Sequence, residues 1–292
     1  MTDLKQAFAE TREQLDKIIL AYRRGVPLPH PETLVWYRND TLSSFNIEGV
    51  LGQNSIPDKE NAVKVEIGSK VTSIGTNAFY NCSGLTSITI PDSVTSIGSQ
   101  VFYDCSGLTS ITIPDSVTSI QDSAFRGCSG LTSITIPDGV TSIGSSAFSG
   151  CSGLTSITIP DGVTRIEATT FYGCSGLTSV TIPDSVTNIG SSTFQYCSGL
   201  TSVVIPDSVT EIGNYAFDKC SKLSLIICQA TVAPTVQSKT FGTNTSSYTG
   251  RNTYSSGNNV LKVPKDATGY DSGAWLDPLQ NSSKCGFHIE YI

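Results

Sequence analysis

The sequence is poor in charged residues, histidine and methionine. Charged residues make up 15% of the chain, and there are two histidines and one methionine among 292 residues. An average soluble domain has roughly 25% charged residues. We find no paired acid and base, no G-x-S-x-G, no P-loop and no dinucleotide-binding fingerprint, and His30 and His288 have no nucleophile or ligand set near them in sequence. We therefore predict a protein that is not an enzyme and holds no cofactor.

Basic charge and long apolar runs are also scarce. The 25 acidic residues outnumber the 18 basic ones, which gives a net charge of −7, so we expect no surface that follows a nucleic-acid backbone. No apolar run has the length of a membrane span. Charged side chains such as Asp3, Lys5 and Glu10 interrupt the first thirty residues, so we expect no secretory signal there.

Nine cysteines would ordinarily suggest a disulfide framework, but their spacing indicates an internal repeat. Equivalent side chains in a parallel stack lie about 4.8 Å apart and point the same way, which is not the geometry of a disulfide. No CxxC pair or interleaved histidine provides a zinc site. We predict buried, reduced thiols that pack as small hydrophobic groups, with Cys228 at an inward strand position and Cys285 as the odd thiol. Seven cysteines recur at intervals of 23 residues: Cys82, Cys105, Cys128, Cys151, Cys174, Cys197 and Cys220.

Each 23-residue unit has the apolar pattern of one coil of a solenoid. Ile88 and Ile90 alternate with polar residues at the period of a short strand. A Pro-Asp-Ser turn follows at 91–93, then a second extended segment at 94–97 and a tight helical or 3-10 turn at 101–102. One unit has an apolar face but no core of its own. We therefore expect the units to stack and bury these faces together.

The repeated pattern L-x-x-I-x-I-P-x-x-V-x-x-I-G-x-x-A-F-x-x-C runs from about residue 62 to 228. It resembles the BspA-like, Treponema-type leucine-rich repeats. The resemblance implies an α/β repeat solenoid that is mainly β, with right-handed coils. It also implies a bacterial or protozoan cell-surface adhesin that binds host proteins or other cells, and it does not imply an enzyme. The segment from Val260 to Pro264, with Tyr270, Trp275 and Leu279 after it, is similar to the strand-then-helix piece that closes such proteins.

The repeats divide the chain into four parts. Residues 1–25 contain a predicted N-terminal helix over 3–23, whose Leu4, Phe8, Leu15 and Ile18 form a short coiled-coil-like seam that either packs on the solenoid or joins protomers. Residues 26–61 form a proline-rich tether and a cap over the first coil, with the cap expected at 36–50. Residues 62–228 are the repeats, and residues 229–292 are a C-terminal insertion and cap.

One aspartate recurs in the Pro-Asp turn of every unit. Stacked carboxylates about 5 Å apart repel each other by roughly 1 kcal/mol in water. Two interpretations are open: each carboxylate caps N–H groups of its own turn, or calcium binds between coils. We favour capping and predict no metal site. The residues concerned are Asp92, Asp115, Asp138, Asp161, Asp184 and Asp207.

Serine and threonine form outward rows on the first strand of each unit. The arrangement is similar to the threonine-rich faces of ice-binding solenoids, but the motif is Ser-x-Thr and Val204 breaks it. Plain exposed strand positions are the simpler interpretation.

The units differ most just after the repeated phenylalanine, on loops that a rigid stack would hold in place. Such loops are the usual position of recognition residues, and exposed tyrosines among small polar groups are typical of paratopes. Drift at unconstrained sites explains the variation equally well. The candidate partner-binding residues are Tyr80, Tyr103, Arg126, Tyr172, Tyr196 and Tyr215.

We therefore predict a non-catalytic adhesion module that recognises a protein or glycan on a cell or host surface through these variable loops. One alternative is a receptor-binding fibre component of a phage or contractile particle, with residues 3–23 as the attachment and homo-oligomerisation end. A second is a structural or ice-binding scaffold. The resemblance implies a cell-surface or extracellular location, and without a secretory signal a virion or cytoplasmic origin remains open.

Overall fold

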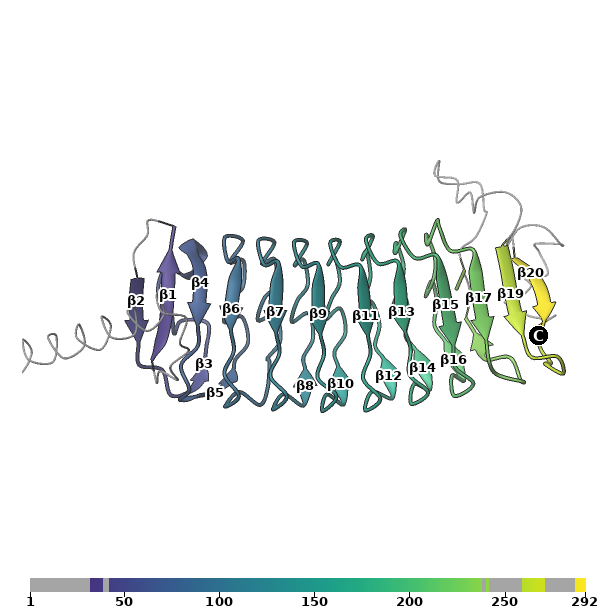
Figure 1. The fold of residues 1–292 in the computed structure, drawn as a ribbon, viewed down its shortest axis with the longest axis horizontal. Coiled ribbons are helices and arrows are strands. Elements are labelled where there is room, and N and C mark those ends of the chain that lie inside the picture. The colour runs from purple at the N-terminus through teal and green to yellow at the C-terminus, as the bar shows by residue number, and fades with distance from the viewer. Residues whose placement is uncertain (1–31, 39–41, 238–239, 242–258, 271–286) are drawn as a thin grey trace, which may run out of the picture.

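The computed structural model is an elongated solenoid of about eight turns, in which short, mostly parallel strands alternate with turns (Figure 1). It describes residues 32–38, 42–237, 240–241, 259–270 and 287–292. The predicted helix at 3–23, the closing helix around Trp275 and Cys285 therefore lie outside the described residues. Within the described ranges, no helix has the length and apolar character needed to cross a membrane.

The first face of the solenoid carries the S-I-T strands of the repeat. They pair in parallel with equivalent residues aligned, as in Ser110 with Ser133 and Ile111 with Ile134. The strands of this face are β4 (Ala62–Glu66), β6 (Ser87–Thr89), β7 (Ser110–Thr112), β9 (Ser133–Thr135), β11 (Ser156–Thr158), β13 (Ser179–Thr181), β15 (Ser202–Ile205), β17 (Leu225–Cys228), β19 (Asn259–Val263) and β20 (Phe287–Tyr291).

The second face carries the shorter segment that follows the Pro-Asp turn. Bridges from Ile74 to Ile97 and from Ile97 to Ile120 continue its ladder where the strands are interrupted. The strands are β3 (Gly49–Leu51), β5 (Val71–Ile74), β8 (Ser119–Ile120), β10 (Ser142–Ile143), β12 (Arg165–Ile166), β14 (Asn188–Ile189), β16 (Glu211–Ile212) and β18 (Thr235–Val236).

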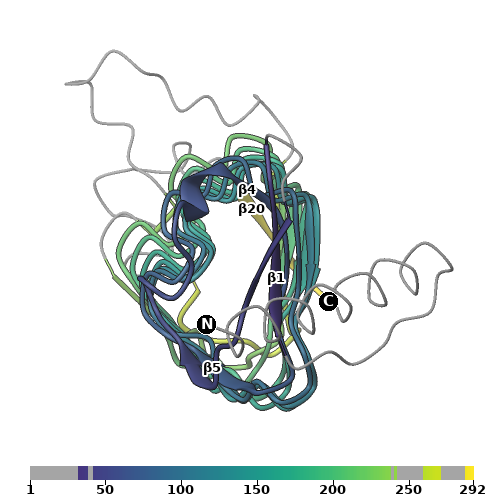
Figure 2. The same ribbon diagram turned by 90° about the vertical axis from the view of Figure 1, so that its left-hand side faces the viewer.

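The core consists of columns of identical side chains that run along the solenoid axis, because successive coils superimpose in projection (Figure 2). One coil buries Leu108, Ile111, Ile113, Val117, Ile120, Phe125 and Cys128. The phenylalanine column forms a continuous stack, with ring centroids 5.2 to 5.8 Å apart from Phe79 to Phe241. Stacking therefore provides the core that a single unit lacks.

The third side of the coil, which we call the turn side, carries the segments around the repeated phenylalanines. Their conformation differs from the prediction. The segments around the phenylalanines are successive turns and not helical or 3-10 turns; the one 3-10 segment among the described residues is η1 (Lys59–Asn61). Asn77 and Asn81 have φ of 59° and 60°, and such left-handed residues interrupt a helix. The N–H of Phe79 therefore donates to Val101 O of the next coil, at 2.9 Å.

The N-terminal cap is a hairpin. β1 (Thr33–Tyr37) pairs antiparallel with β2 (Leu42–Phe45) on one side and with β4 on the other. Leu34 and Val35 are fully buried in it. The hairpin covers the edge of the first coil, which an open stack would expose to solvent.

The solenoid continues beyond residue 228. Phe241 stacks on Phe217 at 5.8 Å, and β18 pairs with β16. This coil is one residue longer than the repeat, and the columns of equivalent residues nevertheless continue through it. Leu225 then pairs with Val260, and Val260 with His288, in parallel. The long insertion therefore interrupts the sequence pattern without ending the strand ladder.

Lys59 performs a capping role that the sequence did not reveal. Its side chain is 7% exposed, and Nζ donates to the carbonyl oxygens of Gln53 at 3.0 Å, Asn77 at 2.8 Å and Ala78 at 3.0 Å. The equivalent of Ala78 in the next coil is Val101, and its carbonyl oxygen accepts the N–H of Phe79. The ammonium thus replaces a backbone donor where the stack begins, and burial lowers its pKa.

We expect Lys59→Met to destabilise the protein by about 2–3 kcal/mol, because buried carbonyls lose their donors. Urea unfolding followed by circular dichroism measures the loss. The control is Lys70→Met, which removes a more exposed lysine paired with Glu48 at 2.6 Å and should cost at most about 1 kcal/mol. Equal losses in the two variants would contradict the capping role.

Candidate partner-binding surface

The variable residues after each phenylalanine form one row along the turn side, which we call the turn edge. The backbone fixes this row, because the N–H of Asp104 donates to Arg126 O and that of Gly127 to Ser149 O, at 2.7 and 2.8 Å. Each coil therefore holds its neighbour's loop rigidly. The turn edge consists of Tyr80, Tyr103, Arg126, Ser149, Tyr172, Gln195 and Asp218, with Asn81, Asp104, Gly127, Gly150, Gly173, Tyr196 and Lys219 directly after them.

Three predicted site residues form a stack at one end of the turn edge. The rings of Tyr80 and Tyr103 are stacked with centroids 4.9 Å apart and an interplanar angle of 21°. The guanidinium carbon of Arg126 lies 5.4 Å from the centroid of the Tyr103 ring, a cation–π contact. Three successive coils thus order these side chains before any partner binds.

Tyr172 and Tyr196 form a second aromatic group. Their centroids are 5.3 Å apart with the rings edge to face, and the side chains are 36% and 45% exposed. Partial burial and the neighbouring Tyr196 raise the pKa of Tyr172, while Arg126 acts in the opposite direction. The hydroxyl of Tyr172 is therefore a protonated donor at neutral pH.

The turn edge also contains residues that were not among the predicted site residues. Ser149 is buried between the two aromatic groups, and Gln195 Nε2 donates to Asp218 Oδ2 at 2.8 Å. Their positions in the variable column would have identified them. Tyr215 belongs to a different column, two residues before Phe217, where its φ is 58°.

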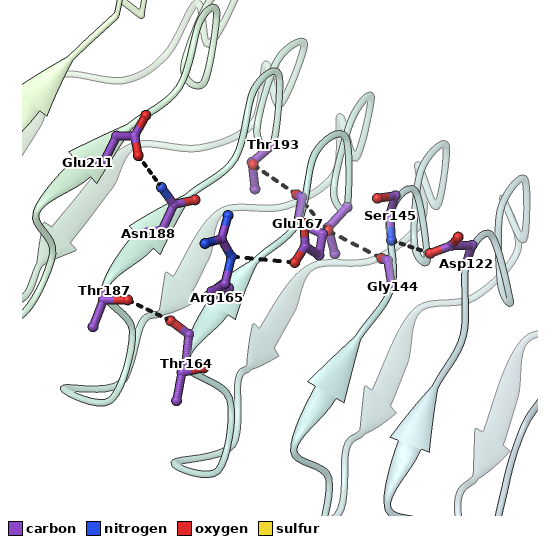
Figure 3. A network of polar contacts seen from close by, with 11 residues as sticks. Asp122, Gly144, Ser145, Thr164, Arg165, Glu167, Thr187, Asn188, Thr193 and Glu211 are labelled. Atoms are coloured by element: carbon purple, nitrogen blue, oxygen red, sulfur yellow. Dashed lines mark hydrogen bonds and ion pairs between the residues drawn. The ribbon is translucent and has the colours of Figure 1, made fainter.

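A second variable surface lies on the second face, where Arg165, Asn188 and Glu211 replace serine (Figure 3). Asn188 Nδ2 donates to Glu211 Oε2 at 2.9 Å, and Arg165 Nε lies 3.6 Å from Glu167 Oε1. The first contact joins two neighbouring coils and the second lies within one coil. Both leave these polar groups with less capacity to bind a partner.

The aspartates of the Pro-Asp turns do not cap them. The turn is closed by the N–H of Val94 donating to Pro91 O at 3.0 Å, and Ser93 Oγ donates to Val71 O of the preceding coil at 2.6 Å. The six aspartates are exposed, and no side-chain hydrogen bond of theirs occurs among the described residues. The same ranges contain no group of three or more His, Cys, Asp or Glu arranged to hold a metal ion.

The seven cysteines of the repeated column are buried free thiols, and so is Cys228 on β17. The prediction of small hydrophobic groups was incomplete, because the thiols also donate hydrogen bonds: Cys151 Sγ lies 3.1 Å from Phe125 O of the preceding coil. Burial raises the pKa of Cys128 and Cys174 to about 12. These thiols therefore stay protonated and act in packing, without the thiolate that reactivity needs.

The Ser-x-Thr rows lie outward on the first face, with Ser156 opposite Ser179 and Thr158 opposite Thr181. The regularity ends at β15, where Val204 is 41% exposed in place of threonine.

Comparison with known proteins gives one family match and several similar solved structures. The BspA type Leucine rich repeat region family matches residues 50–175 and 141–259, in 6 copies. A solved leucine-rich repeat protein from T. pallidum is 30% identical, with 52% of this chain and 71% of that chain covered and a TM-score of 0.49.

A leucine-rich repeat protein from Bacteroides ovatus is 22% identical over 91% of both chains, with a TM-score of 0.35. The pneumococcal vaccine antigen PcpA is 18% identical over 78% of this chain and 68% of its own, with a TM-score of 0.46. No curated protein matches significantly. The family match covers most of the sequence, and the chain therefore belongs to the BspA-type leucine-rich repeat family.

Proposed function

We propose that the protein is a non-catalytic adhesion module that binds a protein or glycan partner through the turn edge. The supporting observation is the stack of Tyr80, Tyr103 and Arg126 on three adjacent coils. Proteins of this family are typically surface binding proteins. Tyrosine and arginine are the residue types that contribute most to binding energy in interfaces, and rigid loops bind with less loss of entropy.

The alternatives have less support. The fibre-component hypothesis depends on self-association through residues 3–23, which lie outside the described residues. The ice-binding hypothesis requires a regular hydroxyl array, and this array ends at Val204.

The test is a triple variant with Tyr80, Tyr103 and Tyr172 changed to serine, compared with the native chain on an array of extracellular-matrix proteins and cell-surface glycans. For any partner that the native chain captures, we expect the affinity to fall at least about a hundredfold, with little change in unfolding midpoint.

The matched control replaces Arg165, Asn188 and Glu211 by serine, the residue that other repeats carry at this position. It should bind like the native chain. Unchanged affinity in the tyrosine variant, or equal losses in both variants, would reject the turn edge as the binding surface.

A further inference from the structure

Arg126 is an exposed cation of the turn edge, third in the row after Tyr80 and Tyr103. Its guanidinium packs against the ring of Tyr103, and no carboxylate among the described residues lies within ion-pair distance of it. Arg165 on the second face differs, because Glu167 lies 3.6 Å from it. A guanidinium is planar and has five donors, and no hydrogen bond or ion pair of the Arg126 side chain occurs within the part of the chain that the structure describes.

The tyrosines on either side of Arg126 add further donors. Tyr80, Tyr103, Tyr172 and Tyr196 make ring contacts, and their hydroxyls have no hydrogen-bond partner within the described ranges. In the parallel stack, Tyr103 is one coil from Arg126 and Tyr172 is two coils away, at roughly 5 and 10 Å along the axis. This part of the turn edge therefore combines a guanidinium with phenolic donors.

The stacking also limits what this surface can recognise. Tyr80 covers one face of the Tyr103 ring and Arg126 covers the other. A neutral sugar ring needs an exposed aromatic face to pack against, and Tyr103 does not provide one. The available groups are hydrogen-bond donors, which favour an acceptor that carries negative charge.

We infer that Arg126 binds a carboxylate of an acidic peptide segment of the partner, with the hydroxyls of Tyr103 and Tyr172 donating to acceptors on either side of that carboxylate. This inference rests on the proposed function and names the partner chemistry of the same surface. A peptide is favoured over an acidic glycan because tyrosine and arginine together are typical of protein interfaces, and because both faces of the Tyr103 ring beside Arg126 are covered.

Asp104 allows a test of whether the bound ligand is negatively charged. It is exposed, and its side chain lies over Gly127, directly after Arg126 in the sequence. A carboxylate there repels an acidic ligand, so removing its charge should strengthen binding.

The experiment uses the full chain and a blocked octapeptide of alternating glutamate and serine, with a glutamine-serine peptide as the matched ligand. Binding is followed by the NMR signals of the arginine side-chain Nε–H groups. The Arg126 signal is assigned by its loss in Arg126→Gln, and the Arg165 signal is the control within the same spectrum. A glucuronate-containing oligosaccharide forms a separate arm.

We expect the glutamate peptide to shift the Arg126 signal and leave that of Arg165 in place, and we expect the glutamine peptide to shift neither. Fluorescence anisotropy with labelled peptide should show affinity at least about tenfold lower in Arg126→Gln, the size of a lost charge-assisted hydrogen bond. It should also show tighter binding in Asp104→Asn and no change in Arg165→Gln.

Equal binding of the two peptides, an unshifted Arg126 signal, or unchanged affinity in Arg126→Gln would overturn the inference. Binding of the uronate oligosaccharide without the peptide would overturn the peptide assignment. The proposed function can survive these results, because it is tested separately: it fails if the triple tyrosine variant keeps its affinity on the array or loses no more than the control variant does.

Discussion

Phe148→Ala is expected to lower the free energy of unfolding by about 4 kcal/mol, the largest effect among the substitutions considered. Phe148 is fully buried at the middle of the phenylalanine column. Its ring lies 5.3 Å from that of Phe125 and 5.7 Å from that of Phe171, nearly parallel to both. The variant therefore loses hydrophobic burial and two aromatic contacts, and it leaves a cavity between three coils.

Urea unfolding followed by far-UV circular dichroism measures this loss. The control is Phe148→Leu, which keeps most of the volume and should cost about 1–1.5 kcal/mol. In a repeat array each coil is stabilised by its neighbours, so the alanine variant should also broaden the transition as the two halves lose their coupling. A loss below about 1 kcal/mol in Phe148→Ala would show that the column does not stabilise the stack.

Gly153→Ala is expected to destabilise the protein by about 3 kcal/mol, through overpacking and not through a cavity. A Cβ atom at Gly153 would lie 2.6 Å from Ser129 O and 3.1 Å from Leu131 O, both backbone atoms of the preceding coil. Backbone cannot move aside as the end of a side chain can. Inserting one methyl group therefore forces two coils apart, and the parallel ladder on the first face is strained with them.

The matched control for this variant is Gly150→Asn in the same coil. Gly150 has φ of +75°, and its nearest atoms to an added Cβ are at 3.6 Å. Asparagine tolerates a left-handed backbone, and Asn81 occupies the equivalent position at φ 60°. This variant should lose less than about 1 kcal/mol. Thermal unfolding measures the stability of both variants. Equal stability of Gly153→Ala and the native chain would show that the preceding coil does not exclude a Cβ atom at Gly153.

The residues that face the core were predictable, because a fixed repeat length places equivalent residues of every unit in the same column. Leu85, Ile88, Phe102 and Cys105 are buried, and the seven cysteines at the 23-residue interval are free thiols in one column. A single unit would not have distinguished a core cysteine from a disulfide or a ligand. Seven copies at one interval did so, since neighbouring coils place equivalent side chains side by side.

The conformation of the turn side was not predictable. Gln100, Ser146 and Thr169 have φ between 56° and 57°, although these residue types carry no signal for a left-handed backbone. The conformation is maintained by hydrogen bonds between coils, such as Phe102 N to Ala124 O at 2.7 Å. Because those bonds form only in the stack, the sequence of one unit suggests a helical turn instead.

The sequence by itself determined the period, the solenoid and the residues that face the core, because each follows from side-chain polarity repeated at a fixed spacing. Only the tertiary structure decided that Arg126 lies over Tyr103, that Tyr172 meets Tyr196, and that Lys59 caps the first coil. It also decided that serine and backbone groups, not aspartate, close the turns. The physical reason is the same in each case. These contacts join different coils, so they depend on the distance between coils and on side-chain conformation, neither of which is encoded in the repeat unit alone.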